Sequence, residues 1–417
     1  MSETTETPEA EPRASRRPFL RVLLSAQESG LVLVIALMML ALTLFGGTKE
    51  VTQRVSIPEG ATVVVYDTQG DAHEPGSIPA RLVDRYVVTT AQGEETSYPS
   101  PWRYAEPNGA PALFIDVVKN KFFEKQNLIQ IARDASFFAV MAVGMTAVII
   151  LAGIDLSVGS IYALAAIIGA TALNKLGADA NGALAVLIGL AVCVGVGGLC
   201  GFANGAMTVG LRVHPFVITL GMMAALRGLT IIIPQRIFGE QSITGFADGF
   251  TSGFFKLQVA EVYPVPPIIM LVVALLGWFV LSRTVFGRRV FAIGGNETAA
   301  KYAGIPVGRV KIWVYTLMGA LAGLSACMYI GYYGSAETGA GMAYELQVIA
   351  AAVIGGASLM GGRGSALGAV LGAIVIKLID NAMIIFEIDQ SWNQVVMGAA
   401  IIVAVVVDQA KRRISGV

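Results

Sequence analysis

The stretch that decides the fold is residues 147–170, AVIILAGIDLSVGSIYALAAIIGA, because a second version of it, AAAVIGGASLMGGRGSALGAVLGA, occupies residues 350–373. A shift of 203 positions aligns the two copies and matches Gly153 with Gly356 and Gly159 with Gly362. An apolar, glycine-rich segment used twice is typical of membrane proteins built from two related halves around a central path. The repeat therefore indicates a transport architecture.

Composition places the chain in the membrane. Hydrophobic residues make up 55% of it, charged residues only 14%, and the mean hydropathy is +0.68, whereas a soluble domain has about 25% charged residues. The net charge is zero, which argues against a nucleic-acid partner because phosphate binding needs a basic surface. The three cysteines lie in apolar segments without metal-ligand spacing, so we expect no metal, cofactor or disulfide.

Hydropathy over a window of about 20 residues predicts an all-α integral membrane protein with about ten transmembrane helices. The predicted spans are 30–47, 133–152, 156–175, 183–207, 215–234, 264–282, 310–333, 344–357, 364–385 and 393–409. Several are short or interrupted by glycine, as the broken helices of transporters are. The fold class is thus two related halves with broken helices.

Lys and Arg predict the orientation, because cytoplasmic loops carry an excess of them. They cluster before the first span, between the sixth and seventh, and at the C-terminus. Ten spans place all three clusters in the cytoplasm. We therefore expect residues 1–29 to be a disordered cytoplasmic tail, 30–47 to be a retained first helix rather than a cleaved signal peptide, and 411–417 to be a second cytoplasmic tail.

The same count of membrane crossings places residues 48–118 outside the cell. Acidic residues outnumber basic ones there by ten to five. Alternating runs at 61–66 (ATVVVY) and 82–90 (LVDRYVVTT) predict a few short strands. Two roles fit this small β-containing insert: shielding of helix ends, or docking of an external partner.

Asp155 lies between two strongly apolar runs, where a charge costs at least ~2.5 kcal/mol by insertion scales. One interpretation is an N-cap for the following helix. The other is that broken helices meet here and their freed backbone groups line the transport route, with Ser157 adding a hydroxyl. The second copy has Ser358 in place of Asp155, again a capping type, which favours a shared structural role.

Further polar residues lie at apparent membrane depth or near its edge. Singly, each fits an interhelical hydrogen bond or an interfacial anchor; together with an aromatic plane they suit a neutral sugar or polyol. The candidate pathway residues are Asp155, Ser157, Asn204, Ser358, Asn381, Trp392 and Asn393.

Glycines recur at four-residue steps on two predicted helices. One set is Gly197, Gly201 and Gly205, and the other is Gly364, Gly368 and Gly372. Small residues at this spacing let helix backbones approach closely, so we expect tight packing at both places.

The basic loop 285–309 predicts a short helix at 296–302 (NETAAKY) with a polar N-cap and a stop at Gly304. Ala299, Ala300 and Gly304, with Glu297 upstream, resemble the cytoplasmic "EAA" coupling motif of ABC importer permeases. In the full motif the Glu directly precedes the alanines, whereas here Thr298 intervenes. The alternative is an ordinary amphipathic loop helix.

Four blocks together resemble the ribose/xylose-type monosaccharide permease family: GIDLSVGS, FGRRVFAIGGNETAAKYAGI, YELQVIAAAVIGGASLMGGRGSALGAVLGA and SWNQVVMGAAII. The resemblance runs from about residue 123 to the C-terminus and makes 119–410 a permease core with 285–309 its coupling loop. It implies a bacterial inner-membrane protein with both termini cytoplasmic. It also implies three kinds of partner in the lipid bilayer or beside it: a cytoplasmic ATP-binding subunit, an extracytoplasmic sugar-binding protein, and a second copy of the permease or a close relative.

The chain has no GxxxxGK[ST] phosphate loop, so ATP hydrolysis is expected in the separate subunit and the chain itself is expected not to be an enzyme. An ion-coupled secondary transporter of a small polar solute would also show repeats and broken helices. That alternative needs membrane-embedded carboxylates, of which the sequence offers few. No HExxH motif points to an intramembrane enzyme.

Overall fold

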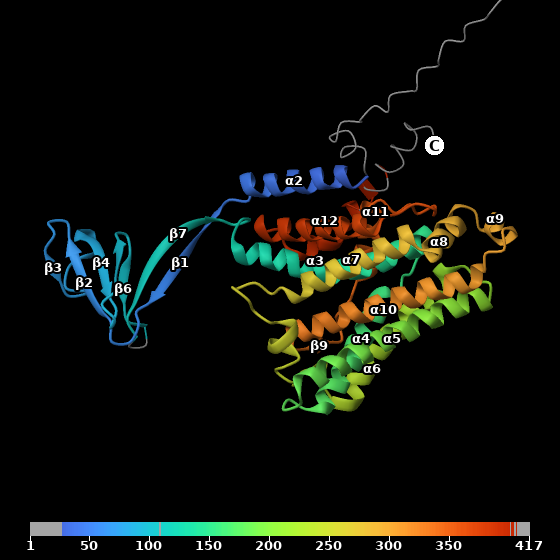
Figure 1. Cartoon of the computed structure of the whole chain (residues 1–417), viewed down its shortest axis with the longest axis horizontal. Coiled ribbons are helices and arrows are strands. Elements are labelled where there is room, and N and C mark those ends of the chain that lie inside the picture. Colours follow the sequence, from blue (N-terminus) through green and yellow to red (C-terminus); the bar gives the residue numbers. More distant parts are fainter. Residues whose placement is uncertain (1–26, 108–109, 401, 404–405, 407–417) are drawn as a thin grey trace, which may run out of the picture. The chain divides into compact units, whose positions relative to one another are not determined.

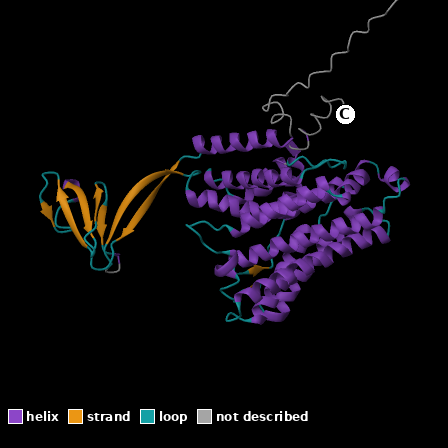
Figure 2. Cartoon of the chain, in the orientation of Figure 1, coloured by secondary structure: helices purple, strands orange, loops and turns teal. Residues whose placement is uncertain are grey.

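The computed structural model describes residues 27–107, 110–400, 402–403 and 406. The chain divides into a helical unit, Met1–Leu40 with Ile129–Val417, and a β unit, Ala41–Leu128. Figure 1 labels the elements of both units, and Figure 2 separates their helices from their strands. The predicted tails 1–29 and 411–417 fall almost wholly outside the described residues.

Long apolar helices dominate the helical unit. In chain order they are α2 (Gln27–Phe45), α3 (Lys125–Ile150), α4 (Val158–Leu176), α5 (Gly182–Gly210), α6 (Pro215–Phe238), α7 (Val265–Arg283), α8 (Val285–Gly295), α9 (Glu297–Tyr302), α10 (Val307–Tyr333), α11 (Tyr344–Ile354) and α12 (Ala366–Ile385). Eight of the described helices are long and apolar enough to cross a membrane: α2 to α7, α10 and α12.

Eight of the ten predicted spans therefore correspond to helices that are long enough to cross a membrane. The predicted span 344–357 is instead the 11-residue helix α11, which at 1.5 Å per residue covers about half of a bilayer's hydrocarbon core. The predicted span 393–409 is helical over 393–400, 402–403 and 406, and its other residues lie outside the described part of the chain. The hydropathy window predicted a full span at 344–357 because it averages over about 20 residues and does not detect that the helix breaks at Gly355.

The helical unit has two ends. Strand β8 (Ser242–Ile243), which follows α6, pairs with β9 (Ala336–Glu337), which follows α10. Asn174 near the end of α4 donates to the Thr244 carbonyl, so the C-terminal ends of α4, α6 and α10 gather at this β9 end. The opposite α9 end contains α9, the α3–α4 loop and the α5–α6 turn.

Glycine brings α5 and α10 together, as the sequence predicted. A Cβ added to Gly201 would lie 2.1 Å from the Tyr315 carbonyl oxygen, and one added to Gly197 would lie 2.2 Å from that of Gly319. Likewise, Gly368 and Gly372 of α12 face the backbone of α11. Both predicted glycine rows therefore form close helix contacts, which in lipid depend on van der Waals packing.

The repeated segment appears as two helix–loop–helix units. In the first, α3 leads through residues 151–157 into α4; in the second, α11 leads through residues 355–365 into α12. The loops touch, because the backbone N–H of Gly362 donates to the Ile150 carbonyl at 2.9 Å. Broken helices thus meet at this point, as predicted for the copy that contains Asp155.

The β unit contains two antiparallel sheets. Their strands are β1 (Thr48–Ser56), β2 (Thr62–Asp67), β3 (Ala72–His73), β4 (Val83–Thr89), β5 (Glu95–Pro99), β6 (Arg103–Ala105) and β7 (Ala112–Asn120), in the orders β1-β7-β6 and β3-β2-β4-β5. The strands predicted at 61–66 and 82–90 are confirmed as β2 and β4. A small apolar core that includes Val65, Val88 and Leu113 holds the unit together.

Candidate translocation pathway and coupling site

Three of the predicted pathway residues lie together in a fully buried polar network. The Asp155 carboxylate accepts hydrogen bonds from the Ser157 backbone N–H at 2.8 Å and from the Ser157 hydroxyl at 2.6 Å. Asn204 of α5 donates its amide to Ser157 Oγ at 2.7 Å and to Asp155 Oδ2 at 3.3 Å. All three side chains are 0% exposed. The network therefore joins the α3–α4 loop to α5.

The structure corrects the capping interpretation of Asp155. Ser157, not Asp155, occupies the N-cap position of α4, and the Asp155 carboxylate accepts the N–H two residues ahead, which is the pattern of an Asx turn. Ser358 repeats the pattern, since its hydroxyl accepts the Met360 N–H at 3.2 Å. The two positions thus share a structural role, as predicted. That role is to stabilise a turn and not to cap a helix.

Other buried polar groups surround the network. Thr219 of α6 donates to the Ile154 carbonyl at 3.4 Å. Four buried groups lack a hydrogen-bond partner within the described part of the chain: Asn204 Oδ1, Thr208 Oγ1, the Tyr315 hydroxyl and the Tyr162 hydroxyl of α4. Unsatisfied buried groups are uncommon in proteins and call for an explanation such as a water or a polar solute. The surroundings of Asp155 can therefore accept further hydrogen bonds.

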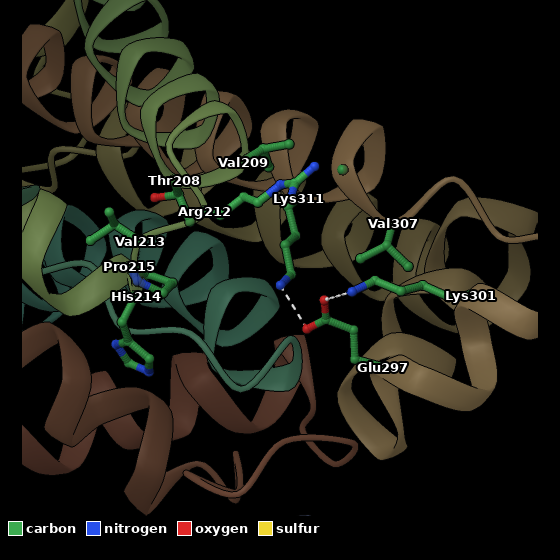
Figure 3. Close-up of a pocket in the computed structure, with 11 residues that line it drawn as sticks. Thr208, Val209, Arg212, Val213, His214, Pro215, Glu297, Lys301, Val307 and Lys311 are labelled. Atoms are coloured by element: carbon green, nitrogen blue, oxygen red, sulfur yellow. Dashed lines mark hydrogen bonds and ion pairs between the residues drawn. The ribbon is translucent and has the colours of Figure 1, made fainter.

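A cavity of about 780 Å³ opens at the α9 end. Its lining residues come from the end of α5, the α5–α6 turn, the start of α6, α9 and the start of α10 (Figure 3): Thr208, Val209, Arg212, Val213, His214, Pro215, Glu297, Lys301, Val307, Gly308 and Lys311. Thr208 lies one helical turn after Asn204 on α5. The cavity therefore reaches α5 one helical turn from Asn204.

The predicted short helix in the 285–309 loop is confirmed as α9. The Asn296 side chain accepts the Ala299 N–H at 2.9 Å, so it caps the helix. The helix ends at Tyr302 and Gly304 follows with a φ of +78°, a conformation that favours glycine.

The predicted coupling residues point in different directions. Ala299 and Gly304 are exposed, and Tyr302 between them is 89% exposed. Ala300 is only 4% exposed and packs into the helical core. The Glu297 carboxylate faces the cavity of Figure 3, where Lys301 and Lys311 hold its pKa below the usual value for a glutamate. Of the four predicted coupling residues, only Ala299 and Gly304 therefore lie on the outer surface of the α9 segment.

Asn381 of α12 lies in a second polar cluster. It is 5% exposed and lines a pocket of about 220 Å³ with Gln130, Ile131, Asp134, Lys377, Asp380 and Ile384. Lys377 binds Asp380 at 2.7 Å and lies 3.5 Å from the centre of the Phe138 ring. Asn393 donates to the other Asp380 oxygen at 3.0 Å.

The predicted pathway residues thus do not form one group. Asp134, beside Asn381, and Ile150, beside the Asp155 loop, are 16 residues apart on α3, or about 24 Å along the helix. Ser358 belongs to the second loop. Trp392 lies in the short helix η4 (Gln390–Trp392) and is 57% exposed. A path through the unit would have to connect clusters at both ends.

Residues 127–405 match the protein family described as branched-chain amino acid transport system / permease component. This match covers more than half of the 417 residues. The chain belongs to this permease family. Strands β1 to β7 lie outside the match.

Curated relatives cover a similar part of the permease. The ribose import permease protein of Escherichia coli (strain K12) is 38% identical over 301 residues, which are 72% of this chain and 90% of the relative. The D-allose transport system permease protein of the same strain is 38% identical over 72% of this chain and 88% of its own length. The fructose import permease protein of Rhizobium meliloti is 34% identical over 72% and 82%. No solved structure matches the chain.

The chain is therefore a multi-pass membrane permease of an ABC transport system, and such subunits are not themselves ATPases. This assignment agrees with the missing phosphate loop and favours ATP-driven transport over the ion-coupled alternative.

Several residues around the buried network and the cavity were not predicted from the sequence. Thr208 could have been found, because it lies one turn from Asn204 on the same helix face. Tyr315, Lys311 and Arg212 gave no such signal, because their positions depend on how α10 and the α5–α6 turn pack in three dimensions.

Proposed function

We propose that this permease forms the membrane pathway of an ATP-driven importer that carries a monosaccharide. The similarity to the ribose import permease, 38% identity over 90% of that relative, carries the proposal. In this arrangement a binding protein delivers the sugar outside the cell and an ATPase subunit drives its import from the cytoplasm. A second copy of the permease, or a close relative, completes the assembly in the bilayer.

The α9 end faces the cytoplasm in this proposal. Basic residues near this end support the orientation, since cytoplasmic segments of membrane proteins are enriched in Lys and Arg. They are Arg212, Arg283, Arg288, Arg289, Lys301, Arg309, Lys311 and Arg363. The β unit and the β9 end then lie outside, both termini lie in the cytoplasm, and the membrane is the bacterial inner membrane.

The exposed side of α9 is the proposed contact for the ATPase subunit. Ala299 and Gly304 are small and exposed, and Tyr302 projects between them with 89% of its surface accessible. A rigid aromatic anchor flanked by small residues suits insertion into a groove, because tyrosine buries a large area at low entropic cost.

The pocket around Asn381 is the proposed outer contact for the sugar. Carboxylate, amide and ammonium groups from α3 and α12 line it. Such groups can form hydrogen bonds with sugar hydroxyls. Asn393 and Trp392 extend this region, while Asp155, Ser157, Asn204 and Ser358 belong to the inner part of the pathway.

The cargo class can be tested with the assembled transporter. The family description names branched-chain amino acids, whereas the relatives named above are sugar permeases. We expect ribose or a related monosaccharide, presented with the binding protein, to stimulate ATP hydrolysis by the reconstituted complex. Stimulation by leucine and not by any monosaccharide would contradict the proposal.

A further inference from the structure

Glu297 holds two lysines, and the two ion pairs differ in what they connect. Lys301 lies four residues later on the same helix, and its Nζ is 2.8 Å from Glu297 Oε1. Lys311 lies on the neighbouring helix α10, and its Nζ is 2.7 Å from Glu297 Oε2. Figure 3 shows both lysines converging on this carboxylate. Only the Lys311 pair links α9 to a transmembrane helix.

The Lys311 pair is also the better shielded of the two. The side chain of Lys311 is 19% exposed, whereas that of Lys301 is 61% exposed. Exposed ion pairs are weakened by water and salt, and partly buried pairs are weakened less. The Lys311 pair should therefore persist when the cytoplasmic face is solvated.

Ala300 packs α9 into the helical core, whereas the Glu297 side of α9 borders the cavity. Glu297 and Lys301 of α9 line it together with Val307 and Gly308 at the start of α10. Residues of the α5–α6 turn, such as Arg212 and His214, line the same cavity. The ion pair to Lys311 thus spans the edge of a cavity.

Lys311 lies one turn before Tyr315 on α10. Tyr315 is buried, and its hydroxyl oxygen lies 2.7 Å from the position that a Cβ on Gly153 would occupy. The Tyr315 carbonyl also contacts α5 at Gly201. A displacement of α10 at Lys311 would therefore reach both the α3–α4 loop and the helix that carries Asn204.

We infer that the Glu297–Lys311 ion pair is the connection through which α9 moves α10, and that Lys311 is a positioning residue for energy coupling. The inference rests on the proposed role of α9 as the ATPase contact. It also changes the role of Glu297, which binds within the permease while Ala299 and Tyr302 present the outer surface.

The test compares Lys311→Met with Lys301→Met, its matched control on the same carboxylate. In proteoliposomes that contain the permease, its ATPase subunit and the binding protein, ribose uptake and ATP hydrolysis are measured together. We expect Lys311→Met to lower uptake per ATP hydrolysed by about fivefold or more, while ATP hydrolysis and complex assembly persist. Lys301→Met should retain the wild-type ratio.

Two further variants keep the inference falsifiable if Lys311→Met folds poorly. Glu297→Gln should match Lys311→Met rather than Lys301→Met. The exchange of Glu297→Lys with Lys311→Glu, made in the Lys301→Met background to remove repulsion, should restore part of the coupling. A wild-type ratio in both Glu297→Gln and Lys311→Met, or an equal loss in Lys301→Met, would overturn the inference. If the wild-type complex showed no ATP-dependent uptake, the proposed function would fail instead.

Discussion

The backbone carbonyl of Ile150 accepts a hydrogen bond of 2.9 Å from the backbone N–H of Gly362. Ile150 ends α3 and Gly362 lies in the α11–α12 loop, so the two copies of the repeated segment are joined where their helices break. Gly294 at the end of α8 lies against the same carbonyl, because a Cβ added to it would lie 1.6 Å from the Ile150 oxygen. This junction connects both repeats to the segment that leads into α9.

Gly294→Ala should therefore destabilise the permease, since the added methyl group has no room beside the Ile150 carbonyl. Overpacking of this kind costs about 1–3 kcal/mol or more of unfolding free energy. Gly295→Ala is the matched control, because no atom lies within 4 Å of its added Cβ. Thermal unfolding in detergent should separate the two variants. Equal melting temperatures would show that the junction is not closely packed.

The two neighbouring alanines of α9 should respond differently to a bulky substitution. Ala300→Leu places extra volume in the core, where Ala300 is 4% exposed, and should lower the unfolding free energy by about 1–3 kcal/mol. Ala299→Leu lies on the surface and should leave melting unchanged but weaken co-purification with the ATPase subunit. Tyr302→Ala should behave like Ala299→Leu. Normal ATPase binding in both surface variants would exclude this side of α9 as the contact.

Asp155→Ala should leave the Ser157 N–H unsatisfied in the buried network and should cost about 1–3 kcal/mol of stability. Asp155→Asn keeps an oxygen that can accept this N–H, so its cost should be smaller. Chemical denaturation of the purified permease measures both. If the two variants unfolded alike, the turn would not depend on this acceptor.

Acid should loosen the β unit through Asp67. A hydrogen bond from His73, followed by that from the Asp71 N–H, lowers the pKa of Asp67 below its usual 3.8. Because the folded-state pKa is the lower one, the contribution is complete above the usual value and is lost as pH falls through the folded-state value. Hydrogen exchange of β2 and β3 in the intact chain should therefore accelerate in acid below that pH. Asp67→Asn should remove this pH dependence; an unchanged profile would contradict the account.

Hydropathy predicted the long helices because a span of about 20 apolar residues is required by the bilayer itself. It could not predict that α11 stops after 11 residues, since Gly355 and Gly356 differ little from glycines inside other helices. The glycine rows predicted close contacts without naming the partner. That Gly201 faces Tyr315 depends on the packing of two helices more than 100 residues apart.

For the candidate site, the sequence likewise predicted individual residues but not the contacts between them. Asp155 was predictable as a charge at membrane depth, and Asn204 as an isolated amide. Their hydrogen bond was not predictable, because it joins positions 49 residues apart. A motif predicted a coupling role for Glu297, but its carboxylate pairs with Lys301 on the same helix and with Lys311 on another. Sequence therefore located the polar residues, and tertiary packing decided which of them act together.

The central claim is that this permease moves its cargo only when separate subunits hydrolyse ATP. Uptake of radiolabelled ribose into proteoliposomes tests it most directly, with the permease reconstituted alone or together with its ATPase subunit and binding protein. The account predicts accumulation against the gradient only in the complete assembly and only with ATP. Uphill accumulation by the permease alone, driven by a proton or sodium gradient, would contradict it.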